Sequence, residues 1–122
     1  MTWQYEQGTG RLTHDGELIT SDGYSGSGAD KNVPAAESKP FLGPVPRGTY
    51  TIGEPMANGG HMGPFVLPLT PSPVNNMFGR DGFFIHGDSI NAPGTASNGC
   101  VILNRQWRTM IAQSGDNMLV VV

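Results

Sequence analysis

The sequence predicts a mainly β fold with one short helix near its C-terminal end. Glycine and proline are frequent, with 18 and 10 copies in 122 residues, and they separate short apolar runs in the way that turns separate strands. Only residues 104–113 place apolar side chains at helical spacing. A chain of this length buries roughly two thirds of its unfolded surface. We therefore expect residues 1–122 to form one domain, built as a β-sandwich or a mixed sheet.

The N-terminal residues predict a three-stranded meander. Trp3–Tyr5 alternates apolar and polar side chains, and Arg11–His14 follows a turn rich in glycine. Asp15 and Gly16 then form a dipeptide that favours a two-residue hairpin turn, which leads into Glu17–Thr20.

The middle of the chain alternates predicted loops with predicted strands. Gly23–Pro40 lacks periodicity and predicts an irregular loop or lid. Pro44–Ile52 predicts a turn that leads into a strand, and Gly53–Gly63 predicts a second loop. Phe65–Leu69 predicts a strand that Pro68 confines to a sheet edge or a bulge, because proline has no N–H to donate.

Three further buried strands are expected in the last third of the chain. After a loop over residues 71–80, the apolar runs Phe83–Ile85 and Val101–Leu103 predict two short strands, and Asn117–Val122 predicts a closing strand. If the first two lie side by side, the residues at their ends meet at one rim of the sheet.

The one predicted helix spans Asn104–Gln113, with Asn104 as its N-cap. Its apolar side chains at i, i+3 and i+4 are Trp107, Met110 and Ile111. We expect this face to pack against the sheet.

Composition excludes several classes of partner. Seven basic and ten acidic residues give a net charge of −3, and no basic cluster suggests binding to nucleic acid or to an anionic membrane. No apolar run approaches the length of a membrane span. Residues 1–6 lack the basic segment and apolar core of a signal peptide, so we expect a protein made in the cytoplasm.

The single cysteine, Cys100, is the strongest candidate for chemistry. One thiol cannot form an internal disulfide, and one cysteine with scattered histidines is a poor zinc site, so no metal or cofactor is expected. The pattern favours a nucleophile at the start of a buried strand. The alternative is a small buried apolar side chain, the usual environment of a free cysteine.

His86 is the candidate base, because a thiol near its free pKa is mostly protonated at neutral pH. It ends an apolar run, and the carbonyl of Gly87 or the carboxylate of Asp88 is positioned in sequence to orient its ring. For Asp88 a solvated turn carboxylate is the better interpretation. The alternative for His86 is a histidine that only satisfies its own hydrogen bonds at a strand end.

Residues before the cysteine predict an oxyanion hole, which needs N–H groups aimed at one point. Gly99 permits such a backbone conformation beside Cys100, and Asn98 adds backbone and side-chain donors. Ser97 shapes the same loop and is a candidate for substrate contact. Ordinary turn chemistry explains Ser97 and Asn98 equally well.

Other polar residues are weaker candidates. Arg105 is the arginine nearest to Cys100 in sequence and is a candidate to bind a substrate carboxylate, whereas a surface role is the better interpretation of Arg47 and Arg80. His61, in a predicted loop, is a candidate substrate contact.

These motifs resemble a known family. His86-Gly87 followed by Ser97–Cys100 is similar to the L,D-transpeptidase signature, and Pro46–Tyr50 resembles a Pro-x-Gly-x-Tyr segment of the same superfamily. Closer still is the type VI secretion L,D-transpeptidase effector family, which Thr2–Gly10 and Gly23–Gly26 resemble. The segments Gly43–Gly48 and Phe84–Gly87 do so as well, and the likeness covers nearly the whole chain.

The resemblance implies an L,D-transpeptidase-like domain that cleaves peptidoglycan tetrapeptide stems before their terminal D-alanine. Cys100 would then be the nucleophile, His86 the base and the Gly87 carbonyl its orienting group. The backbone N–H groups of Asn98, Gly99 and Cys100 would form the oxyanion hole, with Tyr24 among the substrate-binding residues. The thioester would pass to water, to a free D-amino acid or to another stem. Such effectors act in the periplasm of a target bacterium and have a cognate immunity protein.

One departure from the signature concerns substrate binding. The second histidine of the general motif is Asn98 here, and the arginine that follows the cysteine is displaced to Arg105. The competing class is a non-catalytic wall-binding or phage-structural module in which Cys100 is a buried core residue.

Overall fold

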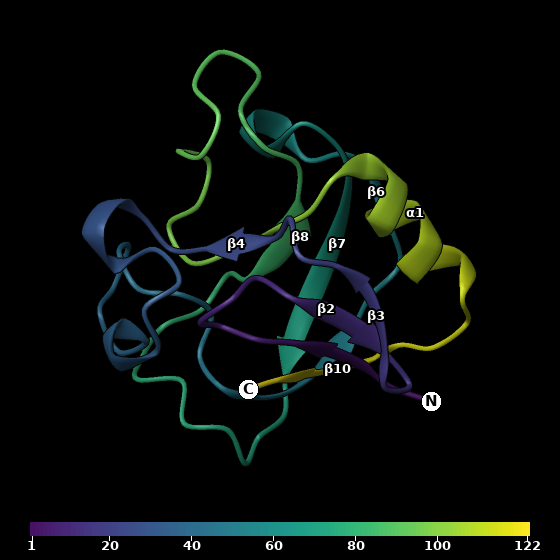
Figure 1. Cartoon of the computed structure of the whole chain (residues 1–122), viewed down its shortest axis with the longest axis horizontal. Helices are drawn as coiled ribbons and strands as arrows, with labels where there is room; N and C mark the ends of the chain where they lie inside the picture. The colour runs from purple at the N-terminus through teal and green to yellow at the C-terminus, as the bar shows by residue number, and fades with distance from the viewer.

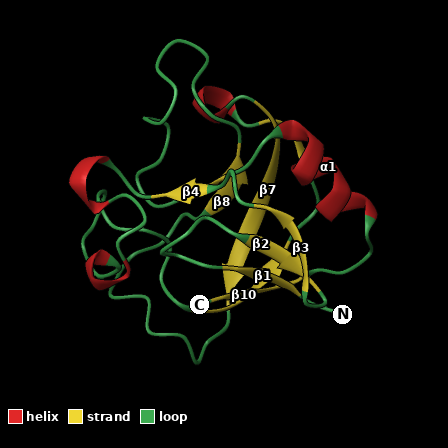
Figure 2. Cartoon of the chain, in the orientation of Figure 1, coloured by secondary structure: helices red, strands yellow, loops and turns green.

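The computed structural model describes residues 1–122 and is built from ten short strands. The strands are β1 (Trp3–Tyr5), β2 (Leu12–His14), β3 (Glu17–Thr20), β4 (Tyr24–Ser25), β5 (Gly48–Ile52), β6 (Met56–Asn58), β7 (Pro64–Pro71), β8 (Phe84–His86), β9 (Val101–Ile102) and β10 (Met118–Val121). The helices are α1 (Arg105–Gln113) and the 3-10 turns η1 (Gly28–Asp30), η2 (Pro34–Ala36) and η3 (Gly60–Met62). The expected mainly β fold with one short helix is confirmed (Figure 2).

The strands form one curled mixed sheet in the order β3-β2-β1-β10-β5-β7-β8-β9-β4, with β6 paired to β7 beside this path. The pairs β1–β10 and β8–β9 are parallel, and the other pairs are antiparallel. Helix α1 packs beside β7 and β8, while the turns η1 and η2 lie on the opposite side of the molecule (Figure 1).

The predicted meander is confirmed as β1, β2 and β3. Asp15 and Gly16 have φ angles of 50° and 85°, the left-handed conformation that a tight hairpin turn requires. The meander joins the rest of the sheet through β10, where Trp3 pairs with Leu119 and Tyr5 with Val121. All four of these side chains are buried in the main hydrophobic core.

Two predicted loops contain more regular structure than expected. Gly23–Pro40 begins with β4 and includes η1 and η2, and Gly53–Gly63 includes β6 and η3. These pieces span only two or three residues each. Such short segments show no regular spacing of apolar residues in the sequence. Their conformation follows from the neighbouring segments with which they form hydrogen bonds.

The expectation that Pro68 confines its strand to an edge was wrong, because β7 lies inside the sheet between β5 and β8. Three strands pair with different parts of it. Strand β5 pairs with residues 69–71, β6 with Pro64 and Val66, and β8 with Leu67 and Pro68. Pro68 thus lies between the residues that pair with β5 and those that pair with β6, and its carbonyl accepts from the N–H of Gly53. A missing donor is tolerated at this position.

Helix α1 begins after Asn104 as predicted, although the Asn104 side chain makes no capping hydrogen bond. Ile111 is buried, but Met110 is exposed. The buried face is completed by Arg108, whose side chain was not expected in the core.

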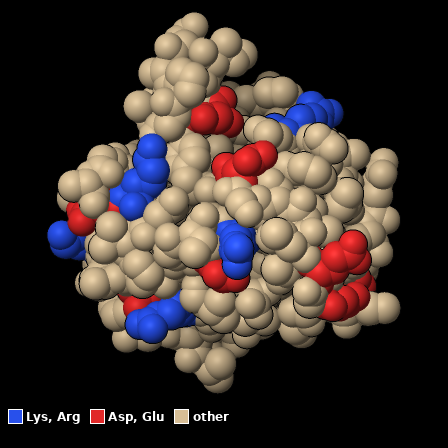
Figure 3. All heavy atoms as spheres, in the orientation of Figure 1, with Lys and Arg blue, Asp and Glu red and all other residues tan.

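The surface carries no single dominant charge. On the face shown in Figure 3, basic and acidic side chains are scattered in small groups, several of which adjoin a group of the opposite charge. The longest helix is α1, and no helix has the length and apolar character needed to cross a membrane.

Candidate active site

Strands β8 and β9 bring His86 and Cys100 to the same cavity, which has a volume of about 1350 Å³. The strands are parallel, with Ile85 paired to Val101 and His86 paired to Ile102. Continuing this register by one residue places Cys100 beside Phe84, two positions before His86. Residues two positions apart along a strand face the same side of a sheet. Cys100 and His86 therefore share a face as a diagonal pair on neighbouring strands, roughly 8 Å apart.

Cys100 is partly exposed at the cavity wall. Its Sγ lies 3.8 Å from the carbonyl oxygen of Gly82. Burial raises the pKa of the thiol, while the backbone N–H of Phe84 and the charge of Arg80 oppose this shift. The thiol is therefore protonated at neutral pH, and a nucleophilic role for it requires a base.

His86 is buried at the end of β8, and its Nδ1 lies 2.9 Å from the carbonyl oxygen of Gly87. Because a carbonyl only accepts, Nδ1 carries the proton of the neutral ring and Nε2 is left with a free lone pair. Burial lowers the pKa of His86, and the charge of Arg108 lowers it further. His86 is thus a neutral imidazole at pH 7, the state that a general base requires.

Hydrogen bonds from two serine side chains hold the loop before Cys100 in place. Ser97 Oγ accepts from the N–H groups of Gly26 (2.9 Å) and Gly99 (3.1 Å), and it donates to the Cys100 carbonyl (2.6 Å). Ser25 Oγ donates to the Gly99 carbonyl at 2.9 Å. Ser97 is buried behind the cavity wall, so it organises the loop and does not face a substrate.

Gly99 cannot readily be replaced. Its φ of 139° lies in a region that disfavours residues with a Cβ, and a Cβ there would lie 2.5 Å from Arg80 Nη2. The Gly99 N–H is already bound to Ser97, whereas the N–H groups of Asn98 and Cys100 make no hydrogen bond within the protein. Of the three expected oxyanion-hole residues, Asn98 and Cys100 thus keep free backbone donors.

Arg80 is buried and not on the surface as expected, because four backbone carbonyls surround its guanidinium. Nη1 donates to the carbonyls of Glu37 and Pro44, and Nη2 donates to those of Gly43 and Asn98. The residue therefore ties the loop before Cys100 to the segment around residues 37–44. It also brings a positive charge close to the thiol.

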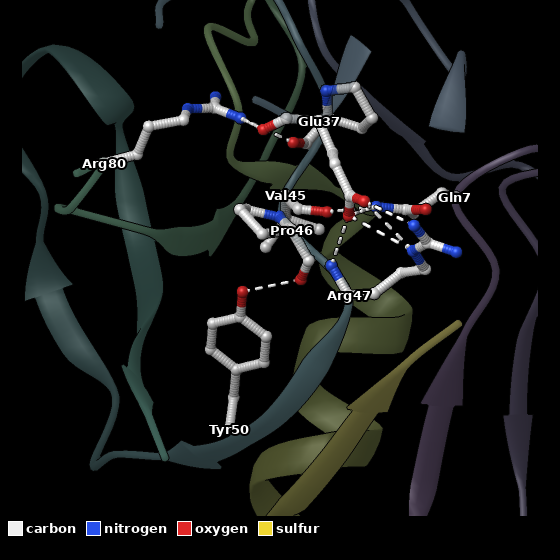
Figure 4. A network of polar contacts seen from close by, with 8 residues as sticks. Gln7, Glu37, Val45, Pro46, Arg47, Tyr50 and Arg80 are labelled. Carbon is white, nitrogen blue, oxygen red and sulfur yellow. Dashed lines mark hydrogen bonds and ion pairs between the residues drawn. The ribbon is translucent and has the colours of Figure 1, made fainter. Parts of the chain in front are cut away.

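Figure 4 shows the network that holds this segment in place. The Glu37 carboxylate accepts from the Arg47 guanidinium (Nη2, 2.6 Å) and backbone N–H (2.9 Å) and from Gln7 Nε2 (3.1 Å). Gln7 Nε2 also donates to the Val45 carbonyl. The exposed Arg47 side chain thus serves structure and lies outside the cavity wall.

Tyr24 and Asp88 hold the long loop between β8 and β9, which projects from the body at the top of Figure 1. Tyr24 Oη donates to Asp88 Oδ1 (2.5 Å) and accepts from the Ala96 N–H (3.0 Å), and Asp88 also accepts from the N–H of Gly94. Tyr24 lies outside the cavity wall. Tyr24 is thus not a simple substrate contact, and Asp88, which lines the cavity, is more than a solvated turn residue.

Of the other expected substrate contacts, His61 and Arg105 line the cavity and are exposed. Arg105 places its guanidinium over the Phe65 ring, 4.4 Å from the centroid. His14 lies elsewhere, stacked on Trp3 and 2.6 Å from Asp116 Oδ2. His14, Asp15 and Asp116 offer donor atoms within 4.8 Å of one another, but the short His14–Asp116 contact is a hydrogen bond that needs no ion.

Arg80 and Arg108 are the residues that sequence reasoning missed. Arg108 lines the cavity and is 6% exposed, with its Nε and Nη1 donors directed at main-chain carbonyls. A signal for it existed, because Arg108 lies three residues before Ile111 on the predicted buried helix face. Arg80 offered no comparable pattern.

The fold and cavity place the chain among proteins with the L,D-transpeptidase fold. It is similar to the helical cell shape determining protein Pgp2 from Campylobacter jejuni (TM-score 0.65, 18% identity, 98% of this chain and 46% of that chain). It is also similar to the L,D-transpeptidase (Yku) from Stackebrandtia nassauensis (TM-score 0.58, 14% identity, 99% of this chain and 54% of that chain). A third similar structure is an L,D-transpeptidase from Mycobacterium smegmatis (TM-score 0.51, 16% identity, 99% of this chain and 58% of that chain). The chain spans about half the length of these proteins.

The family itself follows from the sequence match. The Tlde1 domain model matches residues 19–121, so the chain belongs to the Tlde1 domain family. A search of curated proteins found no match. The fold expected from the resemblance is therefore confirmed.

Proposed function

We propose that this chain is a peptidoglycan-modifying cysteine enzyme, an L,D-carboxypeptidase and L,D-transpeptidase that acts on tetrapeptide stems. The observation that carries the proposal is the pair formed by Cys100 and His86, which share a face of adjacent strands and line one cavity. The Nδ1 contact with Gly87 leaves Nε2 of His86 free to accept the thiol proton. The L,D-transpeptidase fold supports the choice of substrate.

The reaction divides into two transfers at one carbonyl carbon. The Cys100 sulfur attacks the carbonyl of the residue before the terminal D-alanine, and His86 takes the thiol proton. A sulfur–carbon bond forms, the amide carbon–nitrogen bond breaks, and His86 passes its proton to the leaving amine. Water or an amine then attacks the thioester, loses a proton to His86 and releases the thiol.

Backbone donors serve the tetrahedral intermediate. The free N–H groups of Asn98 and Cys100 border the cavity and are the donors assigned to the developing oxyanion. Arg80 holds the Asn98 carbonyl, which fixes the orientation of the following peptide groups.

The test is incubation with a disaccharide-tetrapeptide and analysis of the products by mass. Wild type should release D-alanine and leave a tripeptide, whereas Cys100→Ser and Cys100→Ala should do neither. Both variants should keep the fold, because loss of a small, partly exposed side chain costs at most a few kcal/mol. Near-wild-type cleavage by Cys100→Ser would show that the thiol is not the nucleophile.

The competing class, a non-catalytic module, is tested by alkylation. Cys100 lies at the wall of a cavity and is not fully buried, which supports the enzyme. Iodoacetamide should modify it in the folded protein near neutral pH. Modification only after unfolding would favour the binding module.

The biological setting is part of the same proposal. The family resemblance favours a type VI secretion effector that damages the wall of a rival bacterium from the periplasm and is neutralised by an immunity protein. Expression with an added periplasmic export signal should lyse the host cell, and expression without it should not. Cys100→Ser with the same export signal is the matched control, and lysis by that variant would contradict the proposal.

A further inference from the structure

We propose that Arg108 binds the α-carboxylate of the amino acid that leaves the thioester carbonyl or attacks it, and so restricts the enzyme to free C-terminal residues and free amino acids. The inference rests on the proposed function. It assigns a substrate subsite to a residue of α1 that the sequence motifs did not single out.

The first argument concerns the hydrogen bonds that the Arg108 guanidinium donates. Nε donates to the Leu103 carbonyl (3.0 Å), and Nη1 donates to the carbonyls of Pro64 (2.9 Å) and Phe65 (2.6 Å). These bonds fix the plane of a side chain that is only 6% exposed. The two N–H groups of Nη2 have no partner within the protein.

The second argument is the direction of Nη2. A Cβ built on Gly87 would lie 2.8 Å from this nitrogen, so Nη2 adjoins the residue that orients His86. Arg108 also lines the cavity that holds Cys100 and His86. A buried cation with free donors therefore borders the cavity on the side of the base.

The third argument comes from the reaction. His86 must reach the nitrogen of the leaving amino acid to protonate it, and the same nitrogen position is occupied by an attacking amino acid. In an α-amino acid the carboxylate is bonded to the carbon that carries this nitrogen. A carboxylate must therefore lie within a few ångströms of the base, which is where Nη2 of Arg108 offers its donors.

The other arginines at the cavity are less suited to this task. The donors of Arg80 are directed at four carbonyls. Arg105 is exposed and lies over the Phe65 ring, so water screens its charge. Asp88, the nearby carboxylate, is held by Tyr24 and by backbone N–H groups and does not neutralise Arg108.

The experiment compares two acyl acceptors, D-methionine and D-methioninamide, which differ only in the carboxylate. Wild type should exchange the acid in preference to the amide by roughly 10- to 100-fold, the range of a hydrogen bond to a charged group. Arg108→Lys should lose most of this preference and should release tripeptide more slowly than wild type, because the same side chain binds the leaving D-alanine. Arg105→Lys, one turn away on the same helix, is the matched control and should keep the preference.

The outcomes separate the two proposals. If wild type forms no tripeptide at all, the proposed function fails. If wild type forms tripeptide but uses acid and amide equally, or if Arg108→Lys keeps the wild-type ratio, only the role of Arg108 is overturned.

A second measurement tests the role of Arg108 without relying on the folding of the Arg108→Lys variant. Cys100→Ala protein with ¹⁵N-labelled arginine keeps Arg108 and cannot turn over substrate. A tetrapeptide with a free C-terminus should shift the guanidinium resonance of Arg108, and the C-terminal amide of the same peptide should shift it much less. Equal shifts, or none with the acid, would contradict the proposal.

Discussion

At the scale of single residues, the site depends on two groups that are both neutral at rest. Burial raises the pKa of the Cys100 thiol and lowers the pKa of the His86 imidazole. A preformed thiolate–imidazolium pair is therefore disfavoured, and proton transfer to His86 accompanies attack.

The pH profile of kcat/KM should report this arrangement. Because only neutral His86 accepts a proton and its pKa is lowered, activity should rise with pH and reach its plateau through an inflection below about 6.5, the usual value for histidine. His86→Gln should lose roughly two to four orders of magnitude of activity together with that inflection. His61→Gln, in the same cavity, should keep the inflection. A fall in activity through an inflection above 6.5 would indicate an ion pair instead, because the active histidine would then be protonated.

The sequence singled out the proposed reacting pair, Cys100 and His86, because both residues flank apolar runs that predict buried strands. It did not identify the buried guanidinium groups, since Arg80 and Arg108 are buried only because the fold supplies backbone carbonyls for them. It also assigned Ser97 to substrate contact, although the fold uses it to brace the cysteine loop.

Arg80 should affect the chemistry from a distance. Arg80→Gln removes a positive charge near Cys100, so the thiol pKa should rise further and the pH midpoint of alkylation by iodoacetamide should move upward. Arg80→Lys keeps the charge and should shift the midpoint less. Arg11→Gln makes the same change of net charge at an exposed site and is the control. An unchanged midpoint in Arg80→Gln would show that the charge does not reach the thiol.

At the scale of elements, Glu37 supports the site without lining the cavity. Its carboxylate joins the turn after β1 through Gln7 and the residues before β5 through Arg47. Its backbone carbonyl in turn accepts from Arg80. A change at Glu37 should therefore affect stability before it affects chemistry.

The stability effect of Glu37 should depend on pH. Hydrogen bonds from Arg47 and Gln7 lower the pKa of the Glu37 carboxyl, against the opposing effect of burial. A lowered pKa stabilises the fold above the unfolded pKa of about 4.3, and this stabilisation is lost as pH falls through the folded value. Glu37→Gln should reduce the free energy of unfolding by about 1–3 kcal/mol at pH 7. Denaturant curves should show a smaller difference from wild type below pH 4, and a constant difference would contradict this account.

Strands and helices could be predicted where the spacing of apolar residues and the flanking turn or cap residues indicate the same element, as in β1 to β3 and α1. Strands β4 and β6 were missed because two or three residues carry no period, and β7 was placed at an edge because local rules for proline ignore a change of partner along a strand. The order of the strands was not predictable, since β1 pairs with β10 across nearly the whole chain.

At the scale of the whole molecule, the cavity is large for the small domain that contains it. Its wall includes loop residues Phe41, His61 and Ile90, and Phe41 and Ile90 are exposed apolar side chains at the rim. The segments that border the cavity therefore include more than the two predicted loops, Gly23–Pro40 and Gly53–Gly63. The loop between β8 and β9 contributes as well.

The products should reflect an accessible thioester. Water and small amines should reach Cys100 more readily than a second bulky stem, so tripeptides and D-methionine-tetrapeptides should exceed cross-linked dimers. Pentapeptide stems should not react. The measurement is a digest of sacculi treated with the protein and excess D-methionine. Abundant dimers without either product would contradict the expectation.

The position of β10 governs the order in which the molecule can form. This strand lies between β1 and β5, so the earliest and middle parts of the sheet remain unjoined until residues 118–121 are available. Pairings across such long sequence separations fold slowly, because the loop must close before its contacts form. A nascent chain that ends before this strand exposes two unpaired edges, which are sites for aggregation. The sheet that carries the cavity is thus completed only when residues 118–121 have paired, and a chain cut before them should aggregate.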